Sequence, residues 1–291
     1  MKTINKSMDV KDLETEKGKQ TIEELKQLIK EYESKGCKIS SWYGESEPTE
    51  GGIKFGEANK GYDYKPILEK RLDIKYPNFL LWEIHWVYTN LNFKNGDLVL
   101  DIGGACSLFS FYLASKGMKV IAIDLNPKIV EEANRIAKVM NLDYTAICSD
   151  AEDFLLNTKE KFDFITSICV FEHIEINKRK RIVKNLHNCL KKDGKIAFTF
   201  DYKNPSRFIK IDNVEDIEAH FLCSDKLVML ENQKFYDNNT NYLVSLFYRK
   251  PRLWRWKFRL ILNGEFKIWE YFKTKNYNDY TFGAIFLEIK K

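Results

Sequence analysis

The sequence predicts an α/β fold, in which a doubly wound, mostly parallel, seven-stranded sheet carries helices on both faces. Three observations support this class. Short apolar runs alternate with amphipathic segments of helical length from residue 97 to residue 200. The connections between these segments are short, as in compact strand–helix units. The run 280–291, "YTFGAIFLEIKK", is a further apolar segment of strand length. We therefore expect this run to be a terminal strand of the same sheet.

Residues 1–95 are predicted to be a helical extension that includes an active-site loop. The first twenty residues are charged and aperiodic, so we expect them to be mobile. Thr21 and Glu24 have the spacing of a capping box, which predicts a helix that begins there and ends at Gly36. The range 42–61 is rich in Gly, Glu and Ser and predicts a loop. The apolar run 79–91 predicts a second helix.

Residues 96–236 are predicted to be the core of the protein. Strands are expected over 98–102, 119–123, 144–148, 162–168 and 195–200, and helices over 107–116, 128–140, 151–156 and 178–190. The Asn126-Pro127 pair is typical of a helix start. In the last of these helices, the apolar positions are expected to face the sheet. The basic positions expected to face water are Lys178, Arg179, Lys180 and Lys184.

The strand–helix alternation weakens after residue 200, and residues 237–279 are predicted to be a cap or insertion before the terminal strand 280–291. Within it, the run 247–269, "FYRKPRLWRWKFRLILNGEFKIW", interleaves basic and aromatic residues. Such a run is compatible with single-stranded nucleic acid, with a membrane surface, or with an aromatic lid or oligomer contact. A packed cap with a basic outer face is the simplest interpretation.

Composition limits the class of protein. The chain has 291 residues, 31% of them charged, a net charge of +5 and no run of eighteen apolar residues, so it is expected to be globular without a transmembrane segment. The start of the sequence lacks the apolar segment of a secretory signal. Six cysteines without a C-x-x-C pair argue against zinc and disulfides and favour the cytoplasm. The mild charge permits a small anionic substrate without requiring nucleic acid.

The first turn of the core, in "VLDIGGACSLFSFYLASKG", limits the choice of cofactor. A dinucleotide loop would need G-x-G-x-x-G, but counting from Gly103 places Ala105 and Leu108 at the second and third glycine positions. A leucine there would obstruct close packing of the helix on the strand, and Asp101 would lie beside two phosphates. Both features oppose NAD.

S-adenosyl-L-methionine suits the same region better because it carries no phosphate and has an ammonium group that an acid can neutralise. Asp101 at the end of the first strand can meet that ammonium. Asp124 at the end of the second strand can accept from the ribose hydroxyls, and Asp150 after the third strand can accept from the adenine amino group. Asp124 and Asp150 could instead serve as helix caps, and each residue could fill both roles.

Five segments occur in the order and spacing of one family: "VLDIGGACSLFSFYLASKG", "VIAIDLNP", "CSDAED", "FDFITSICVFEHI" and "LKKDGKIAFTF". On these segments the chain resembles the class I, Rossmann-like, S-adenosylmethionine-dependent methyltransferases. Ala105 and Ser107 stand where the family motif has glycines, and an alanine there is strained only if its φ is positive. Beside the three acids, the resemblance implies cofactor contacts by Gly103, Ala105, Leu125, Ala151, Ser167 and Ile168.

His173 and Glu172, in "VFEHI" just past the fourth strand, are the candidate catalytic residues. A histidine is a natural base for a hydroxyl nucleophile, and Glu172 could orient the imidazole or meet a metal. Some relatives bind magnesium through E-x-x-E-H at this place, but Cys169 holds its first position, so no metal is predicted. A structural role for His173 stays open. Asp201 and Tyr202 are weaker candidates on the acceptor side.

The acceptor is predicted to be a small molecule rather than nucleic acid, since the chain lacks the [DN]-P-P-[YFW] and Pro-Cys motifs of base methyltransferases. The segments 201–204, 235–243 and 282–291 resemble methyltransferases of surface-polysaccharide biosynthesis, such as capsule formation. This resemblance implies O-methylation of a sugar or of a phosphorylated or nucleotide-linked precursor. Methylation of a lipid-linked or other small metabolite and a non-catalytic, cofactor-binding partner subunit are the alternatives. Peripheral contact with a membrane and a homodimer stay open.

Overall fold

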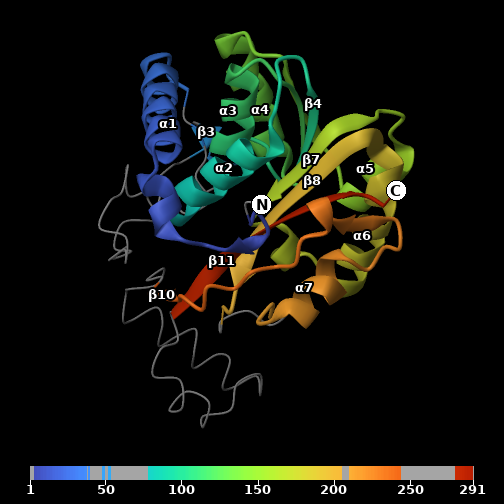
Figure 1. The fold of residues 1–291 in the computed structure, drawn as a ribbon. Coiled ribbons are helices and arrows are strands. Elements are labelled where there is room, and N and C mark those ends of the chain that lie inside the picture. Colours follow the sequence, from blue (N-terminus) through green and yellow to red (C-terminus); the bar gives the residue numbers. More distant parts are fainter. Residues whose placement is uncertain are drawn as a thin grey trace, which may run out of the picture.

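The computed structural model describes residues 3–37, 39, 48–49, 52–53, 78–204, 210–243 and 279–290. These residues form a sheet with helices on both faces, and its core strands run parallel (Figure 1). The predicted fold class is therefore confirmed. Residues 247–269 of the predicted cap, and most of the predicted active-site loop, lie outside the described residues.

The sheet has the order β1-β11-β8-β7-β4-β5-β6, and β9 and β10 also pair with β11, which gives nine strands in the described part instead of the predicted seven. Strands β4 to β8 are parallel, whereas β11 runs antiparallel to β8. The strands span Lys6–Ser7 (β1), Leu98–Ile102 (β4), Lys119–Asp124 (β5), Tyr144–Cys148 (β6), Phe162–Ile168 (β7), Leu190–Tyr202 (β8), Leu227–Met229 (β9), Tyr242–Leu243 (β10) and Asp279–Ile289 (β11). A separate ladder of β2 (Pro48–Thr49) and β3 (Gly52–Ile53) interrupts the predicted loop.

The strand order reverses at β4. The chain adds β5 and β6 on one side of β4 and then crosses to place β7 on the other side. In open α/β sheets, ligands bind beyond the carboxyl ends of the strands at such a switch point. The topology therefore places the expected binding region above β4, β5 and β7.

Two buried apolar cores lie on the two faces of the sheet. Figure 1 shows α1 to α4 together on one side of the strands and α5 to α7 on the other. The first group spans Glu16–Ser34 (α1), Asn78–Leu91 (α2), Leu108–Ser115 (α3) and Pro127–Met140 (α4), and the second spans Ala151–Asn157 (α5), Ile176–Cys189 (α6) and Val214–Phe221 (α7). The 3₁₀ turns are η1 (Val10–Glu14), η2 (Phe171–His173) and η3 (Leu230–Asn232).

The expectation that the first twenty residues are mobile is wrong, because β1, η1 and the start of α1 lie there. Thr15, not Thr21, caps α1: its hydroxyl accepts from the backbone N–H of Gly18 at 3.0 Å. The order comes from contacts distant in sequence. The carbonyl of Ile4 accepts from the indole N–H of Trp86 at 2.8 Å, and the N–H of Met8 donates to the carbonyl of Phe282 at 2.8 Å. Patterns within a short stretch of sequence do not reveal partners that lie so far away in the chain.

Arg179 contradicts the expected water-facing side of α6. Its side chain is fully buried, its Nη2 donates to the carbonyl of Ile174 at 2.9 Å, and its Nη1 contacts Nδ1 of His220 on α7. Burial lowers the pKa of Arg179 to about 10. Helix α7 packs on α6 at this point, and the local pattern of α6 does not reveal it.

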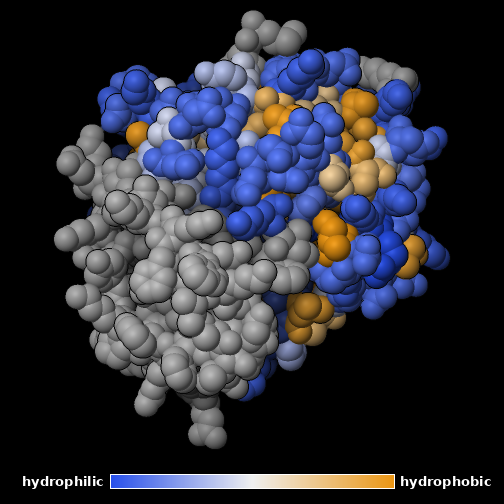
Figure 2. All heavy atoms as spheres, turned by 90° about the horizontal axis from the view of Figure 1, so that it is seen from below, coloured by the Kyte–Doolittle hydropathy of each residue, from blue (hydrophilic) through white to orange (hydrophobic). Residues whose placement is uncertain are grey.

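The described surface is mainly hydrophilic on the face in Figure 2, with apolar residues in separate spots. The large apolar side chains that are exposed in the described part are Leu125, Val139, Leu156 and Tyr236. No helix in the described part of the chain is long and apolar enough to cross a membrane.

Candidate active site

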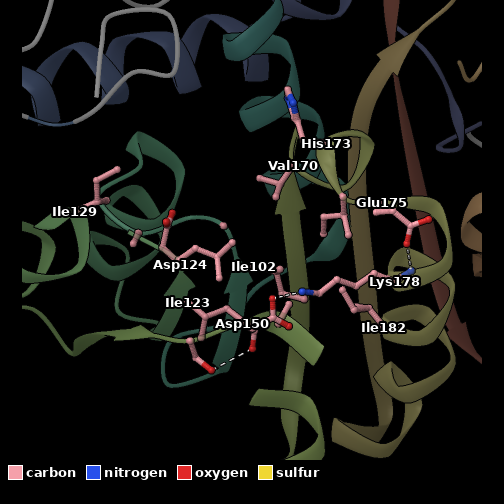
Figure 3. Close-up of a pocket in the computed structure, with 16 residues that line it drawn as sticks. Ile102, Ile123, Asp124, Ile129, Asp150, Val170, His173, Glu175, Lys178 and Ile182 are labelled. Carbon is pink, nitrogen blue, oxygen red and sulfur yellow. Dashed lines mark hydrogen bonds and ion pairs between the residues drawn. The ribbon is translucent and has the colours of Figure 1, made fainter. Parts of the chain in front are cut away.

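A cavity of about 540 Å³ opens beyond the carboxyl ends of β4 and β5 (Figure 3). Its volume lies in the range of small-molecule sites. The predicted site residues on its wall are Gly103, Ala105, Asp124, Leu125, Asp150, Ala151 and His173. The predicted residues Asp101, Ser167, Ile168 and Glu172 are not on this wall.

The turn after β4 brings its backbone to the cavity without strain at Ala105. Gly103 has φ +74°, and a Cβ there would lie 2.6 Å from the Val170 side chain, so only glycine fits. Ala105 does not have a positive φ, whereas Cys106 does, at +61°. Ser107 caps α3, since its hydroxyl accepts from the N–H of Ser110 at 3.0 Å. The two departures from the family motif therefore suit the geometry of this turn.

Asp101 lies behind the turn, away from the cavity. Its carboxylate accepts from the Thr166 hydroxyl at 2.9 Å and from the Ser110 hydroxyl, and a Cβ on Gly104 would collide with it. Burial raises the pKa of Asp101 to about 6, although both hydroxyls favour the ionised form. Both oxygens of this buried carboxylate bind the protein itself, and Asp101 is not on the cavity wall, so the predicted contact with a cofactor ammonium stays a prediction.

Asp124 ends β5 and lies on the cavity wall. Its Oδ1 accepts from the N–H of Asn126 at 2.9 Å, and Asn126 in turn caps α4. Partial burial raises the pKa of Asp124. Leu125 follows on the wall and is 71% exposed. A carboxyl group and an exposed apolar side chain therefore stand side by side on the wall.

Asp150 is the N-cap of α5, which is one of the two roles that the sequence suggested for it, and it also lies on the cavity wall. Its Oδ1 accepts from the N–H of Glu152 at 3.0 Å, and its Oδ2 pairs with Nζ of Lys178 from α6. Partial burial raises the pKa of Asp150, but these partners outweigh that effect and hold it below its usual value. The amphipathic pattern of α6 assigned Lys178 to water, so sequence analysis missed it at the cavity.

Ser167 and Ile168 are buried at the end of β7. The Ser167 hydroxyl donates to the carbonyl of Ile102 at 2.9 Å, which ties β7 to the end of β4 beneath the turn. These two residues support the cavity floor rather than its wall.

His173 and Glu172 are neighbours in η2 but lie in different environments. His173 is exposed on the cavity wall, and Figure 3 shows it pointing away from Asp124 and Asp150. Glu172 is buried, and its Oε1 accepts from the N–H of Asp201 at 3.2 Å. Only His173 is therefore placed to meet a molecule in the cavity.

Glu172 belongs to a buried acidic cluster made up of Glu83, Cys169, Glu172 and Asp201. The Cys169 thiol donates to Oε1 of Glu83 at 2.7 Å. Burial, helped by the neighbouring acids Glu172 and Asp201, raises the pKa of Glu83 to about 8, although hydrogen bonds from Cys169 and Thr199 act in the opposite direction. Potential ligand atoms of Cys169, Glu172 and Asp201 lie within 4.8 Å of one another, so these three could hold a metal ion, although the sequence predicted none. Sequence analysis missed Glu83, whose one signal is a carboxyl group in the apolar run "FLLWEIHWV".

Residues 99–194 match a family model described as a methyltransferase domain. This segment is therefore similar to methyltransferase domains, and it lies in the Rossmann-like core of the fold. Such domains use S-adenosyl-L-methionine, the cofactor that the sequence predicted. The turn at Gly103, the acid at Asp124 and the size of the cavity fit that cofactor.

Individual relatives resemble only part of the chain. The ubiquinone biosynthesis O-methyltransferase of Coxiella burnetii is 30% identical over 109 residues, which cover 38% of this chain and 45% of that protein. The 23S rRNA (uracil(747)-C(5))-methyltransferase of Pyrococcus abyssi is 28% identical over 118 residues, which cover 40% and 26%. The chain thus spans less than half the length of these curated relatives. Their names state different acceptors.

Among solved structures, an S-adenosylmethionine-dependent methyltransferase from Clostridium acetobutylicum is similar, with a TM-score of 0.47 and 14% identity. The similarity covers 72% of this chain and 90% of that one.

Proposed function

We propose that this chain transfers a methyl group from S-adenosyl-L-methionine to an oxygen atom of a small acceptor. The observation that carries the proposal is the cavity itself. Asp124 and Asp150 stand at the strand ends on its wall, and His173 stands on the same wall with its side chain directed away from them. A cofactor held by the two acids would direct its reactive end toward the region that an acceptor must occupy.

Each acid has a distinct task in this proposal. Asp124 accepts hydrogen bonds from the ribose hydroxyls, and Leu125 covers one face of the adenine ring. Asp150 accepts from the adenine amino group, beside the N–H groups at the start of α5. Asp101 acts from behind, where its bonds to Ser110 and Thr166 keep the turn in shape for Gly103 to approach the cofactor.

S-adenosyl-L-methionine supplies a methyl group already activated by a positively charged sulfur. The protein must therefore align the acceptor oxygen and remove its proton. His173 is the candidate base, because an imidazole can accept a proton near neutral pH and this residue is exposed on the wall.

The chemical class of the acceptor is proposed from the sequence resemblance. A sugar or a phosphorylated precursor of a surface polysaccharide, methylated in the cytoplasm, is the first candidate. A lipid-linked or other small metabolite is the alternative, and a partner subunit that binds the cofactor without catalysis is another. A nucleic-acid acceptor is disfavoured because the sequence lacks the motifs of base methyltransferases.

Titration calorimetry with S-adenosyl-L-methionine tests the cofactor site. The wild-type chain should bind, and Asp124→Ala should bind about ten- to a hundredfold more weakly, because it loses hydrogen bonds to a charged acceptor. Asp143→Ala removes an exposed acid next to the start of β6, so it is the matched control and should bind as the wild type does. Absence of wild-type binding at millimolar cofactor would overturn the proposed function. Equal affinities of wild type and Asp124→Ala would overturn the ribose assignment.

A further inference from the structure

Two ion pairs join α5 to α6 side by side. Lys178 pairs with Asp150, and three residues further along α6, Arg181 pairs with Glu152 through Nε–Oε1 at 2.7 Å and Nη2–Oε2 at 3.0 Å. The spacing of three residues puts both cations on one side of α6, facing the first turn of α5. The two pairs thus hold the same two helices together.

Only one of these pairs belongs to the cavity. Asp150 and Lys178 are both on its wall, whereas Glu152 and Arg181 are not. Figure 3 shows the Lys178 side chain reaching from α6 toward Asp150, near Ile182 and Ile102. Its side chain is 35% exposed and that of Asp150 is 19% exposed, so the contact is partly shielded from water.

The pair occupies the acceptor atoms that an adenine amino group would need. Oδ1 of Asp150 holds the N–H of Glu152, and Oδ2 holds the ammonium of Lys178. Each oxygen can accept a second hydrogen bond, so an amino group must share an oxygen with the donor already there or displace that donor, and of the two donors the Lys178 side chain is the one that can move away. Because a hydrogen bond between two charged groups is stronger than one with a neutral donor, the exchange costs binding free energy.

We propose that the Asp150–Lys178 ion pair is a latch on the adenine end of the cavity, and that Lys178 sets the affinity of this chain for its cofactor by competing for Asp150. The inference rests on the proposed function. Lys178 is here an affinity-determining residue that weakens binding of both the cofactor and its demethylated product to a similar degree. Release of the product is then faster than an unlatched site would allow.

The test compares Lys178→Met with Arg181→Met by calorimetry on the full chain, using S-adenosylmethionine and S-adenosylhomocysteine. Met keeps much of the aliphatic length of each side chain and removes its charge. We expect Lys178→Met to bind both ligands about two- to fivefold more tightly than wild type, the range set by the strength of partly exposed ion pairs. Arg181→Met should leave both affinities within error of wild type, since its pair lies outside the cavity.

Ionic strength provides a second readout. Salt weakens a partly exposed ion pair, so the affinity ratio between Lys178→Met and wild type should shrink between 50 mM and 500 mM salt. Equal or weaker binding by Lys178→Met would overturn the latch. A gain confined to S-adenosylmethionine would also overturn it, since that result would reflect repulsion between Lys178 and the charged sulfur. If the wild type binds neither ligand, the proposed function itself fails, a result distinct from these.

Discussion

The cavity wall and the buried acidic cluster lie at the same edge of the sheet, yet their carboxyl groups differ in protonation state. On the wall, Asp150 is held ionised by Lys178 and by a backbone N–H. In the cluster, Glu83 is fully enclosed beside further acids and a thiol, and burial raises its pKa to about 8. Carboxyl groups at the same edge thus carry charge in one place and a proton in the other. Charged and backbone donors keep Asp150 ionised, whereas burial among other acids keeps Glu83 protonated.

The boundary between the two regions runs through a single turn. In η2, Glu172 enters the cluster and His173 faces the cavity. These adjacent residues therefore lie in different environments because their side chains leave the backbone in different directions. Variants on either side of this boundary can test how separate the two regions are.

Glu83→Gln should produce the largest effect, and it should appear in stability. Between about pH 4.5 and 8, Glu83 holds a proton in the folded state but has lost it in the unfolded state, because its pKa is raised on folding. The free energy of unfolding therefore falls as pH rises through that range. We expect wild type to lose on the order of 4 kcal/mol from this group between pH 5 and 9, and Glu83→Gln to lose none of it.

Urea unfolding of both proteins across this pH range measures the difference. Glu160→Gln, at an exposed position beyond α5, should follow the wild-type curve and is the control. Parallel curves for wild type and Glu83→Gln would show that Glu83 is ionised throughout.

His173→Ala tests the residue of η2 that faces the cavity. Loss of a general base lowers turnover by about a hundredfold or more, while the cofactor affinity should stay within about twofold of wild type. Turnover is followed by transfer of a labelled methyl group to the acceptor found in a screen of nucleotide sugars. The contrasting variant is Glu172→Gln, which should mainly reduce the unfolding temperature. Full activity of His173→Ala would remove His173 from the mechanism.

Ser107→Ala should produce the smallest effect, in the turn that separates Asp101 from the cavity. It removes the cap of α3 and should lower the free energy of unfolding by about 1 kcal/mol. Ser107→Gly, which restores the residue typical of the family, should cost only a few tenths of that amount because glycine is itself a fair cap. Thermal unfolding separates the two. A Ser107→Ala variant as stable as the wild type would mean that the hydroxyl contributes nothing to the cap.

Sequence patterns predicted the parallel core well because its signals are local. Apolar strands, the Asn126 cap and the acids at strand ends are all visible within a few residues. Asp124, Asp150 and His173, which these local signals single out, lie on the cavity wall.

The failures share another cause, namely partners distant in the chain. Arg179 is buried because α7 covers it, and Lys178 is drawn to Asp150 from a helix face that looked solvated. Glu83 lies on α2, outside the segment that carries the family motifs, and its partner Cys169 is 86 positions away. No local periodicity encodes such contacts.

The place of β11 has a consequence for the order in which the protein forms. Strand β11 lies between β8 and β1, so the first strand of the chain pairs with its last. Asn5 reinforces this closure, accepting at Oδ1 from the N–H of Phe286 at 2.6 Å. During synthesis on the ribosome, β1 must wait for residues 279–289 to emerge before it can pair with β11. The parallel core can assemble earlier, and the N-terminal strand is added last, although it is made first.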